Sequence, residues 1–215
     1  RETSRDPRVA LVDAIAAIDP DRDATLRPYL ADADPFVVDR VATLLGARPP
    51  QRPPHEMRVS VPTAADVDAL DRTTVTLRLR GGRAFTLRLY GTHAPAAVAR
   101  FVAQVREGQW DGLTFHRVEP GFVVQGGSPS ANEYAGADAF SRDEFSTLSH
   151  VRGTIGISTR GTDTGDGQIF INLVDNARLD FAYTIIGSIV GDASAIDDIV
   201  EGDAIETARA FTRQP

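Results

Sequence analysis

The chain has 215 residues, with 23 basic and 30 acidic side chains and a net charge of −7. Its 42% hydrophobic and 25% charged residues are typical of a globular protein, either one domain or a domain with a small appendage. It contains no cysteine and all 23 basic residues are arginine, which excludes disulfides, cysteine zinc sites, lysine phosphate loops and Schiff bases. No apolar run reaches the roughly 18 residues of a membrane span, and the acidic balance argues against a duplex nucleic-acid binder.

Residues 1–47 are predicted to be helical. Asp6-Pro7 and Asp34-Pro35 each place a capping residue before a proline at the first helical position. A shorter helix is expected at 24–30, and Gly46 ends the last one. The repeated start signal resembles the end of a HEAT-repeat array, whose earlier repeats would precede this chain; the alternative is a helical hairpin packed on the second domain. The apolar stripe of the first helix comprises Val9, Leu11, Val12, Ile15, Ala16 and Ile18.

Residues 48–73 are predicted to be a proline-rich linker and a lead-in to the second domain. Four prolines between 47 and 56 favour an extended, semi-rigid spacer. One interpretation of the lead-in is a strand at Arg58–Val61 followed by a short helical turn.

Residues 74–215 are predicted to form a strand-rich domain. Apolar and polar residues alternate over 75–79 and 85–89 on either side of Gly81-Gly82, which predicts a β-hairpin. A helix is expected at 95–107, closed by Gly108. Many short strands with only two helices favour a β-barrel or sandwich. The other predicted elements are strands at 113–117, 122–126, 154–158, 168–173, 183–190 and 204–211 and a short helix at 193–200.

Two patterns resemble those of catalytic or metal sites, and each also has a structural explanation. Asp163-Thr164-Gly165 matches the aspartic-protease triplet, but a carboxylate dyad needs a second copy, so a protease would have to be a homodimer. The surrounding glycine-rich run has the composition of a surface loop. The histidines lack the spacing of metal ligands and are expected to be structural or solvated: they are His55, His93, His116 and His150.

The most informative stretch is Phe115–Gly127, FHRVEPGFVVQGG. It predicts a strand, a Pro-Gly turn and a second strand, with two glycines where backbones approach closely. Phe115 and Arg117 would share one face of the first strand. Because an arginine among apolar strands is costly unless its donors are used, Arg117 is either in a structural ion pair or functional.

This stretch resembles the signature of the cyclophilin-type peptidyl-prolyl cis-trans isomerases, and Gln168–Asn172, QIFIN, resembles their second signature. The similarity continues through 178–180 and 184–187 and covers about 74–211. It implies a mainly β fold: an eight-stranded antiparallel barrel capped by two helices. It also implies catalysis without a cofactor, acting on proline-containing peptides or unfolded protein segments.

The resemblance assigns roles residue by residue. Arg117 matches the catalytic arginine, Gln125 the glutamine that orients it, and Phe122 a wall of the proline-binding cup. Ser158 and Thr159 fall where the family pairs its backbone with the residue before proline. The remaining substrate-binding positions are Val123, Phe170, Leu179, Tyr183 and Arg178.

Two of these positions depart from the common pattern. Arg178 stands where eukaryotic members often carry tryptophan, so it replaces part of the cup wall with charge. Tyr183 stands where many members have histidine, and bacterial members often have tyrosine. Phe115, Ile171 and Trp110 are expected to be core residues.

The sequence therefore favours an active prolyl isomerase that assists protein folding. The alternative is a non-catalytic module that binds proline-bearing partners together with the helical repeat, which could itself contact a protein partner. Composition leaves the compartment open, with an extracytoplasmic location in a bacterium slightly favoured.

Overall fold

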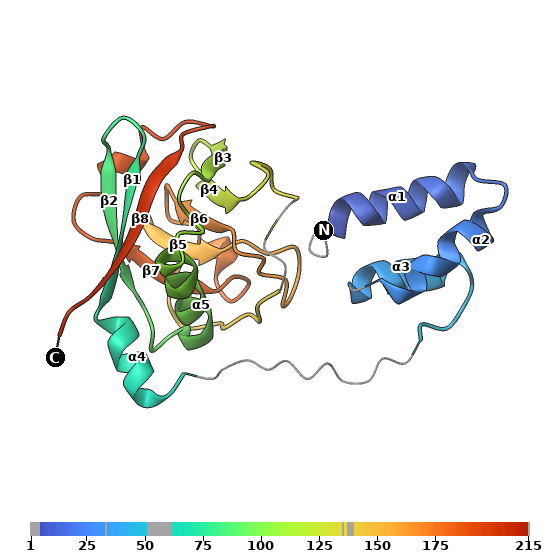
Figure 1. The fold of residues 1–215 in the computed structure, drawn as a ribbon, viewed down its shortest axis with the longest axis horizontal. Coiled ribbons are helices and arrows are strands. Elements are labelled where there is room, and N and C mark those ends of the chain that lie inside the picture. The colour runs from blue at the N-terminus through green and yellow to red at the C-terminus, as the bar shows by residue number, and fades with distance from the viewer. Residues whose placement is uncertain (1–4, 33, 51–61, 135, 137–139, 215) are drawn as a thin grey trace. The chain divides into compact units, whose positions relative to one another are not determined.

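The computed structural model describes residues 5–32, 34–50, 62–134, 136 and 140–214. The chain divides into two compact units (Figure 1), and the division at Arg58/Val59 lies outside the described residues, as does the strand expected at Arg58–Val61. Across the described ranges, none of the helices has both the length and the apolar character needed to cross a membrane.

The first unit consists of short helices around a small apolar centre. Its elements are α1 (Arg5–Ile18), α2 (Arg22–Leu26), the 3-10 helix η1 (Arg27–Ala31) and α3 (Pro35–Leu44). The elements that follow α1 confirm the expected short helix near 24–30, and Gly46, with φ +61°, ends α3 as predicted. The side chains fully buried at its centre are Val12, Leu26, Val37 and Val41.

Asp34 is the clearest example of a predicted cap. It is fully buried, its carboxylate accepts a hydrogen bond from the Phe36 amide at 2.9 Å, and the Arg8 guanidinium lies 3.7 Å away. The equivalent prediction for Asp6 was wrong, because α1 already begins at Arg5. Leu11 and Ile18 of the predicted apolar stripe are 47% and 82% exposed and lie outside the apolar cluster of this unit. The HEAT-like character of this unit stays a prediction.

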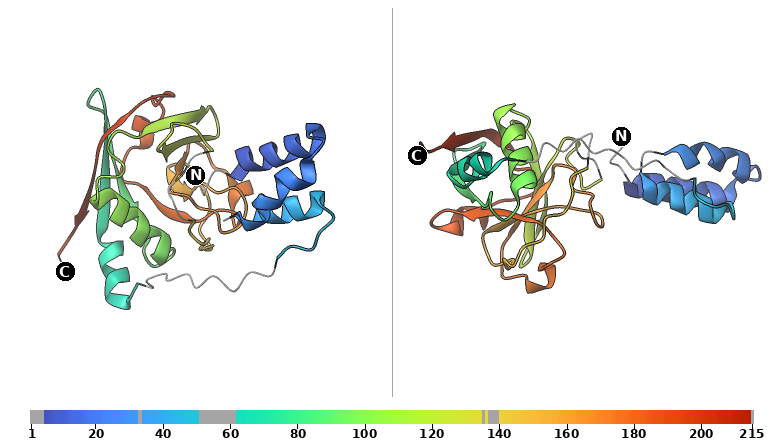
Figure 2. Two further views of the ribbon diagram at one scale, coloured as in Figure 1. Left: turned by 45° about the vertical axis from the view of Figure 1, so that its right-hand side comes forward. Right: turned by 90° about the horizontal axis from the view of Figure 1, so that it is seen from below.

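The second unit is built on one antiparallel sheet of eight strands, in the order β3-β4-β6-β5-β7-β2-β1-β8. The sheet curls into a barrel (Figures 1 and 2), as predicted. Its two edges meet through a bridge between Thr114 and Ala204 and a hydrogen bond from the Phe115 amide to the Asp203 carbonyl. The strands are β1 (Thr73–Leu79), β2 (Ala84–Leu89), β3 (Thr114–Glu119), β4 (Val123–Ser128), β5 (Thr154–Ile157), β6 (Ile169–Asn172), β7 (Ile185–Ile189) and β8 (Ile205–Thr212).

The hairpin of β1 and β2 follows the alternation of apolar and polar residues in the sequence. Val75, Leu77 and Leu79 are fully buried while the residues between them face outward. Gly81 and Gly82 have φ values of +96° and +92°, which only glycine adopts without strain, so the tight turn is specified locally.

Two α-helices pack on the barrel and on each other: α4 (Ala64–Asp71), which begins with a Thr63–Asp66 capping box, and α5 (Pro95–Arg106). The right-hand view of Figure 2 shows them side by side. Leu70 brings α4 into the barrel core, so this part of the lead-in belongs to the second unit. The helix predicted at 193–200 is a single 3-10 turn, η3 (Ala193–Ile196), capped by Asp192.

The amino end of α5 is capped from a distant loop. Both carboxylate oxygens of Glu144 accept hydrogen bonds from the helix, from the Ala96 amide at 3.1 Å and the Ala97 amide at 2.7 Å. An anion is favourable there because it satisfies unpaired amides and the positive end of the helix dipole.

The paired glycines of β4 sit where a side chain would collide with the core. A Cβ at Gly126 would lie 2.8 Å from Phe115 Cδ1, and one at Gly127 would lie 2.6 Å from Trp110 Cη2. Phe115, Trp110 and Ile171 are buried in the core, as expected. These contacts require β4 to approach the core closely at Gly126 and Gly127.

Candidate active site

Four residues form a row across four neighbouring strands. Arg117 on β3 is directly opposite Gln125 on β4, Gln125 is opposite Phe170 on β6, and Phe170 is opposite Gly156 on β5. Directly opposed residues in a sheet project to the same side. Strand register therefore gathers a cation, an amide and an aromatic ring from segments up to 53 residues apart on one face.

The Arg117 guanidinium is held at one side of the row. Its Nη1 donates to Gln125 Oε1 at 3.2 Å, while Nε lies 3.3 Å from Glu119 Oε1 and 4.0 Å from Glu133 Oε2. The Glu119 and Glu133 side chains are 50% and 35% exposed, and ion pairs this open to solvent are worth only about 0–1 kcal/mol, so they do not lock the guanidinium in place. Within the described residues, Nη2 has no hydrogen-bond partner and remains available to a ligand.

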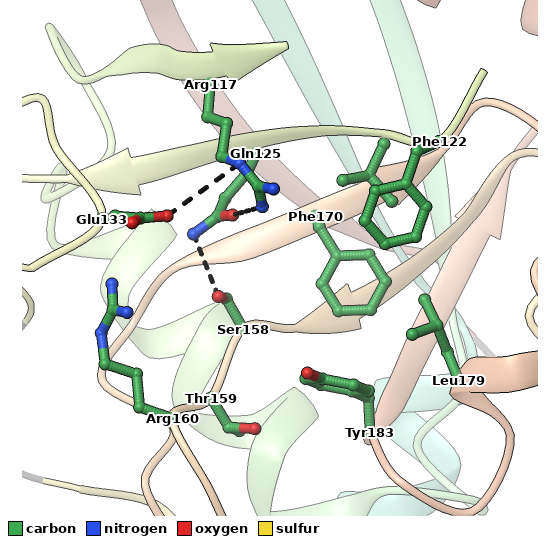
Figure 3. Close-up of a pocket in the computed structure, with 11 residues that line it drawn as sticks. Arg117, Phe122, Gln125, Glu133, Ser158, Thr159, Arg160, Phe170, Leu179 and Tyr183 are labelled. Carbon is green, nitrogen blue, oxygen red and sulfur yellow. Dashed lines mark hydrogen bonds and ion pairs between the residues drawn. The ribbon is translucent and has the colours of Figure 1, made fainter. Parts of the chain in front are cut away.

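The Gln125 amide is fixed at both ends (Figure 3). Its oxygen accepts from Arg117, and its Nε2 donates to Ser158 Oγ at 3.0 Å and to Gln168 Oε1 at 2.9 Å. Gln125 and Gln168 are buried, and Gln168 in turn donates to the Glu133 carbonyl at 3.2 Å. Because every amide atom has a partner, the carbonyl that holds Arg117 cannot rotate away at low cost.

The floor of the site is the Phe170 ring, which is 5% exposed. The His150 ring stacks on it with centroids 5.5 Å apart, and the Tyr183 ring meets it edge-on at 5.5 Å. His150 Nδ1 accepts from Asn172 Nδ2 and Nε2 donates to the Tyr183 carbonyl, an arrangement that requires the neutral imidazole. Burial lowers the pKa of His150, opposed by the Tyr183 carbonyl, so it remains neutral and packs as an aromatic support.

A second buried histidine, His116, lies next to Arg117 in β3. His116 lies at an irregularity in the pairing of β3 with β4, and both of its ring nitrogens are buried without a hydrogen-bond partner in the part of the chain that the structure describes. Burial lowers the pKa of His116, and the positive charge of Arg117 lowers it further. The Thr114 backbone, the Gln168 side chain and the Glu133 carboxylate raise it, but burial outweighs them. A neutral His116 adds no repulsion to the guanidinium beside it.

Eleven residues line one pocket of about 130 Å³ beside the row. Nine of the ten predicted site residues line it: Arg117, Phe122, Val123, Gln125, Ser158, Thr159, Phe170, Leu179 and Tyr183. The tenth, Arg178, is outside the lining, and its guanidinium lies 4.2 Å from the centroid of the Phe122 ring. Figure 3 shows Phe122 and Leu179 on one side of Phe170, with Arg117, Gln125 and Ser158 on the other.

Two lining residues were not predicted, Glu133 and Arg160. Both come from irregular connections, where periodicity carries no signal, and neither lies in the two motifs. Arg160 also packs over the Tyr134 ring at 5.0 Å.

The aspartic-protease pattern is explained by loop structure. Asp163 Oδ1 accepts from the Asp143 amide at 2.9 Å, and the Asp163 amide donates to Asp143 Oδ2 at 2.8 Å. The two residues clasp neighbouring loops, and neither lines the pocket.

The family model described as "Cyclophilin type peptidyl-prolyl cis-trans isomerase/CLD" matches residues 74–214, which is most of the chain and nearly all of the barrel unit. The chain belongs to this family. The cyclophilin-type unit thus includes every residue of the pocket and every strand except the first residue of β1.

Curated relatives and solved structures agree with the family. The chain is 40% identical over 126 residues to a peptidyl-prolyl cis-trans isomerase of Helicobacter pylori, covering 57% of this chain and 78% of that protein. It is 33% identical over 133 residues to peptidyl-prolyl cis-trans isomerase B of Bacillus subtilis, covering 61% and 93%. A cyclophilin-type isomerase structure from Cryptosporidium parvum shares the fold with a TM-score of 0.61 at 20% identity, covering 66% of this chain and 99% of that one.

Proposed function

We propose that the pocket binds a proline in a peptide or unfolded protein segment and that Arg117 stabilises the preceding peptide bond while it rotates between cis and trans. The single observation that carries this proposal is the opposition of Arg117 and Gln125 beside the apolar cup around Phe170. Membership of the isomerase family supports the same activity.

The chemistry needs no covalent step. Rotation about the X–Pro bond breaks amide resonance and meets a barrier of about 18–20 kcal/mol, so spontaneous exchange takes roughly tens to hundreds of seconds. In the twisted amide the prolyl nitrogen regains its lone pair and becomes a better hydrogen-bond acceptor. A donor that binds this state more strongly than the planar amide lowers the barrier. The guanidinium suits this role because it stays charged and holds several donors in one plane.

The cup and the hydrogen-bond chain have separate tasks in this proposal. Phe122, Val123, Phe170, Leu179 and Tyr183 hold the proline ring, whereas Ser158 and Thr159 face the residue before it. Gln125 keeps Arg117 in place before substrate arrives, so no reorganisation is needed at the moment of rotation. A protein that only binds proline would not need a guanidinium beside the cup with an N–H group left without a partner. We therefore favour catalysis over the non-catalytic alternative.

The test is exchange spectroscopy by NMR on a short X-Pro peptide with the full chain. Removal of one preorganised donor typically costs about 10²–10³ in kcat, so Arg117→Ala should lower kcat/KM by about that factor. Arg117→Lys should also be impaired because a point charge cannot reproduce the planar fork. Arg80→Ala, at an exposed arginine outside the pocket, is the matched control. If the Arg117→Ala protein is folded and catalyses exchange at the wild-type rate, the proposed role of Arg117 is wrong.

We further propose that the helical unit recruits protein clients. Leu11, Ile18 and Phe36 are 47%, 82% and 57% exposed, so this unit offers large apolar side chains to a partner. Ile18→Glu should leave kcat/KM for a short peptide unchanged and raise KM for a protein whose refolding is limited by proline isomerisation. Asp39→Asn, at an exposed helical position, is the control, and an unchanged KM for the refolding protein would contradict this assignment.

A further inference from the structure

Arg178 is a charged residue held against the pocket by an aromatic ring. It lies in the 3-10 turn η2 (Ala177–Leu179), immediately before Leu179 of the cup. Its guanidinium carbon is 4.2 Å from the centroid of the Phe122 ring, which is the distance of a direct cation–π contact. Phe122 itself lines the pocket, so the arginine is an outward continuation of the pocket wall.

The stacked guanidinium has no carboxylate partner in the described part of the chain. Some exposed arginines form ion pairs, such as Arg40 with Asp13 at 2.7 Å and Arg152 with Asp197 at 2.7 Å. Arg78 and Arg80, like Arg178, have no carboxylate partner within the described residues. Arg178 is exposed and has no such partner, although acidic residues outnumber basic ones, 30 to 23. A guanidinium whose carbon lies over a ring still carries its N–H donors at its edges, where a planar carboxylate can accept two of them.

The position of Arg178 relative to a bound peptide rests on the proposed function. If the proline ring lies on Phe170 and the residue before it faces Ser158 and Thr159, the chain after the proline leaves on the opposite side of Phe170. Phe122 and Leu179 lie on that side (Figure 3). Arg178 precedes Leu179 in the chain, and its guanidinium lies over the Phe122 ring, so it is on that side too.

We propose that Arg178 is a specificity-determining residue that binds the carboxylate of an aspartate or glutamate following the proline. Stacking on Phe122 places the guanidinium in advance, so less side-chain freedom is lost when a carboxylate binds. The preferred substrates are therefore segments with an acidic residue one or two positions after the proline.

The test compares peptides that differ only at the residue after proline: Ala-Ala-Pro-Glu-Ala, its glutamine analogue and its lysine analogue. Exchange spectroscopy gives kcat/KM, and chemical-shift titration gives Kd. At low ionic strength the glutamate peptide should be preferred over the glutamine peptide by about three- to tenfold, the range of a partly exposed charge-assisted pair. The lysine peptide should be the poorest, and 0.5 M NaCl should remove most of the preference because it screens exposed charges.

Four variants decide the assignment. Arg178→Gln should make the glutamate and glutamine peptides equivalent, Arg178→Lys should restore part of the preference, and Arg80→Gln, at an exposed arginine outside the pocket, should keep all of it. A preference that survives in Arg178→Gln overturns the proposal. So does a preference that disappears in Arg160→Gln instead, since Arg160 lines the pocket beside Ser158 and Thr159 and such a result would reverse the direction of the peptide.

The outcome is separable from that of the proposed function. If no peptide is isomerised by any variant, the catalytic proposal fails, and the Kd values of the three peptides still decide the role of Arg178. If all peptides are isomerised equally well and bound equally tightly by the wild type, the catalytic proposal stands and the inference about Arg178 is wrong.

Discussion

Gly156 closes the row of site residues, and replacing it with alanine should displace the floor of the pocket. A Cβ at this position would lie 2.3 Å from Phe170 Cζ and 2.6 Å from Cε1. Ordinary contacts between carbon atoms are about 3.5–4.0 Å, so the ring tip must retreat by about 1.2–1.7 Å. His150 stacks on the ring and Tyr183 packs edge-on against it, which leaves the pocket as the open side.

The expected result of Gly156→Ala is a larger loss of activity than of stability. Overpacking of this size typically costs about 1–3 kcal/mol of folding free energy. A displacement of about 1 Å in a substrate-positioning group can cost about 10²-fold in rate, so kcat/KM should fall between about tenfold and 10²-fold. NMR exchange on an X-Pro peptide measures the first quantity and urea unfolding the second.

The Phe170→Leu background supplies the control. Leucine is shorter than the ring and leaves room for the added methyl group, so Gly156→Ala should cost little more activity or stability there. Strong non-additivity is the signature of a direct contact. If the two substitutions add independently, or if Gly156→Ala keeps full activity, the argument from the collision with Phe170 is refuted.

Three further outcomes are expected. Gln125→Leu should lower kcat/KM at least tenfold with little change in KM, because Arg117 loses the acceptor that orients it; a change confined to KM would contradict this role. Asp34→Ala should destabilise α1 and α3 by about 1–2 kcal/mol through loss of the buried cap, which hydrogen exchange of those helices would detect; unchanged protection would show that the cap is dispensable. The lowered pKa of His150 means that the unfolded chain binds more protons below the ordinary histidine value of about 6.5, so stability should fall as pH decreases from there. His150→Gln should flatten that part of the urea-midpoint profile, and an unchanged slope would exclude His150 as the titrating group.

The regular parts of the fold could be predicted from local pattern alone. Alternation over 75–79 and 85–89 identifies β1 and β2, and the glycine pair between them identifies their turn. Helix ends were less predictable. At 193–200 two consecutive aspartates follow Ile196, and only a 3-10 turn forms. Asp6 has the chemistry of a cap, yet α1 begins at Arg5, two residues before the predicted start at Pro7; a cap preference is worth only about 1 kcal/mol.

The site divides along similar lines. Arg117, Gln125 and Phe170 were predictable because they belong to two motifs, whereas Glu133 and Arg160 reach the pocket from irregular segments. The support of Phe170 by His150 depends on the packing of a loop against β6, which no local pattern encodes. The sequence also could not predict that a side chain at Gly156 would collide with Phe170. That contact depends on the register between β5 and β6, which places the two residues opposite each other.

The row from Arg117 to Gly156 runs along the hydrogen-bonding direction of the sheet, so each member is supplied by a different strand. During synthesis the arginine emerges from the ribosome long before the ring that completes its surroundings. Long-range pairings of this kind form late because the intervening chain must first be closed into loops. The pocket is therefore complete only after β6 has been synthesised and paired with β4, and a chain truncated before β6 would carry the Arg117 guanidinium without the Phe170 ring.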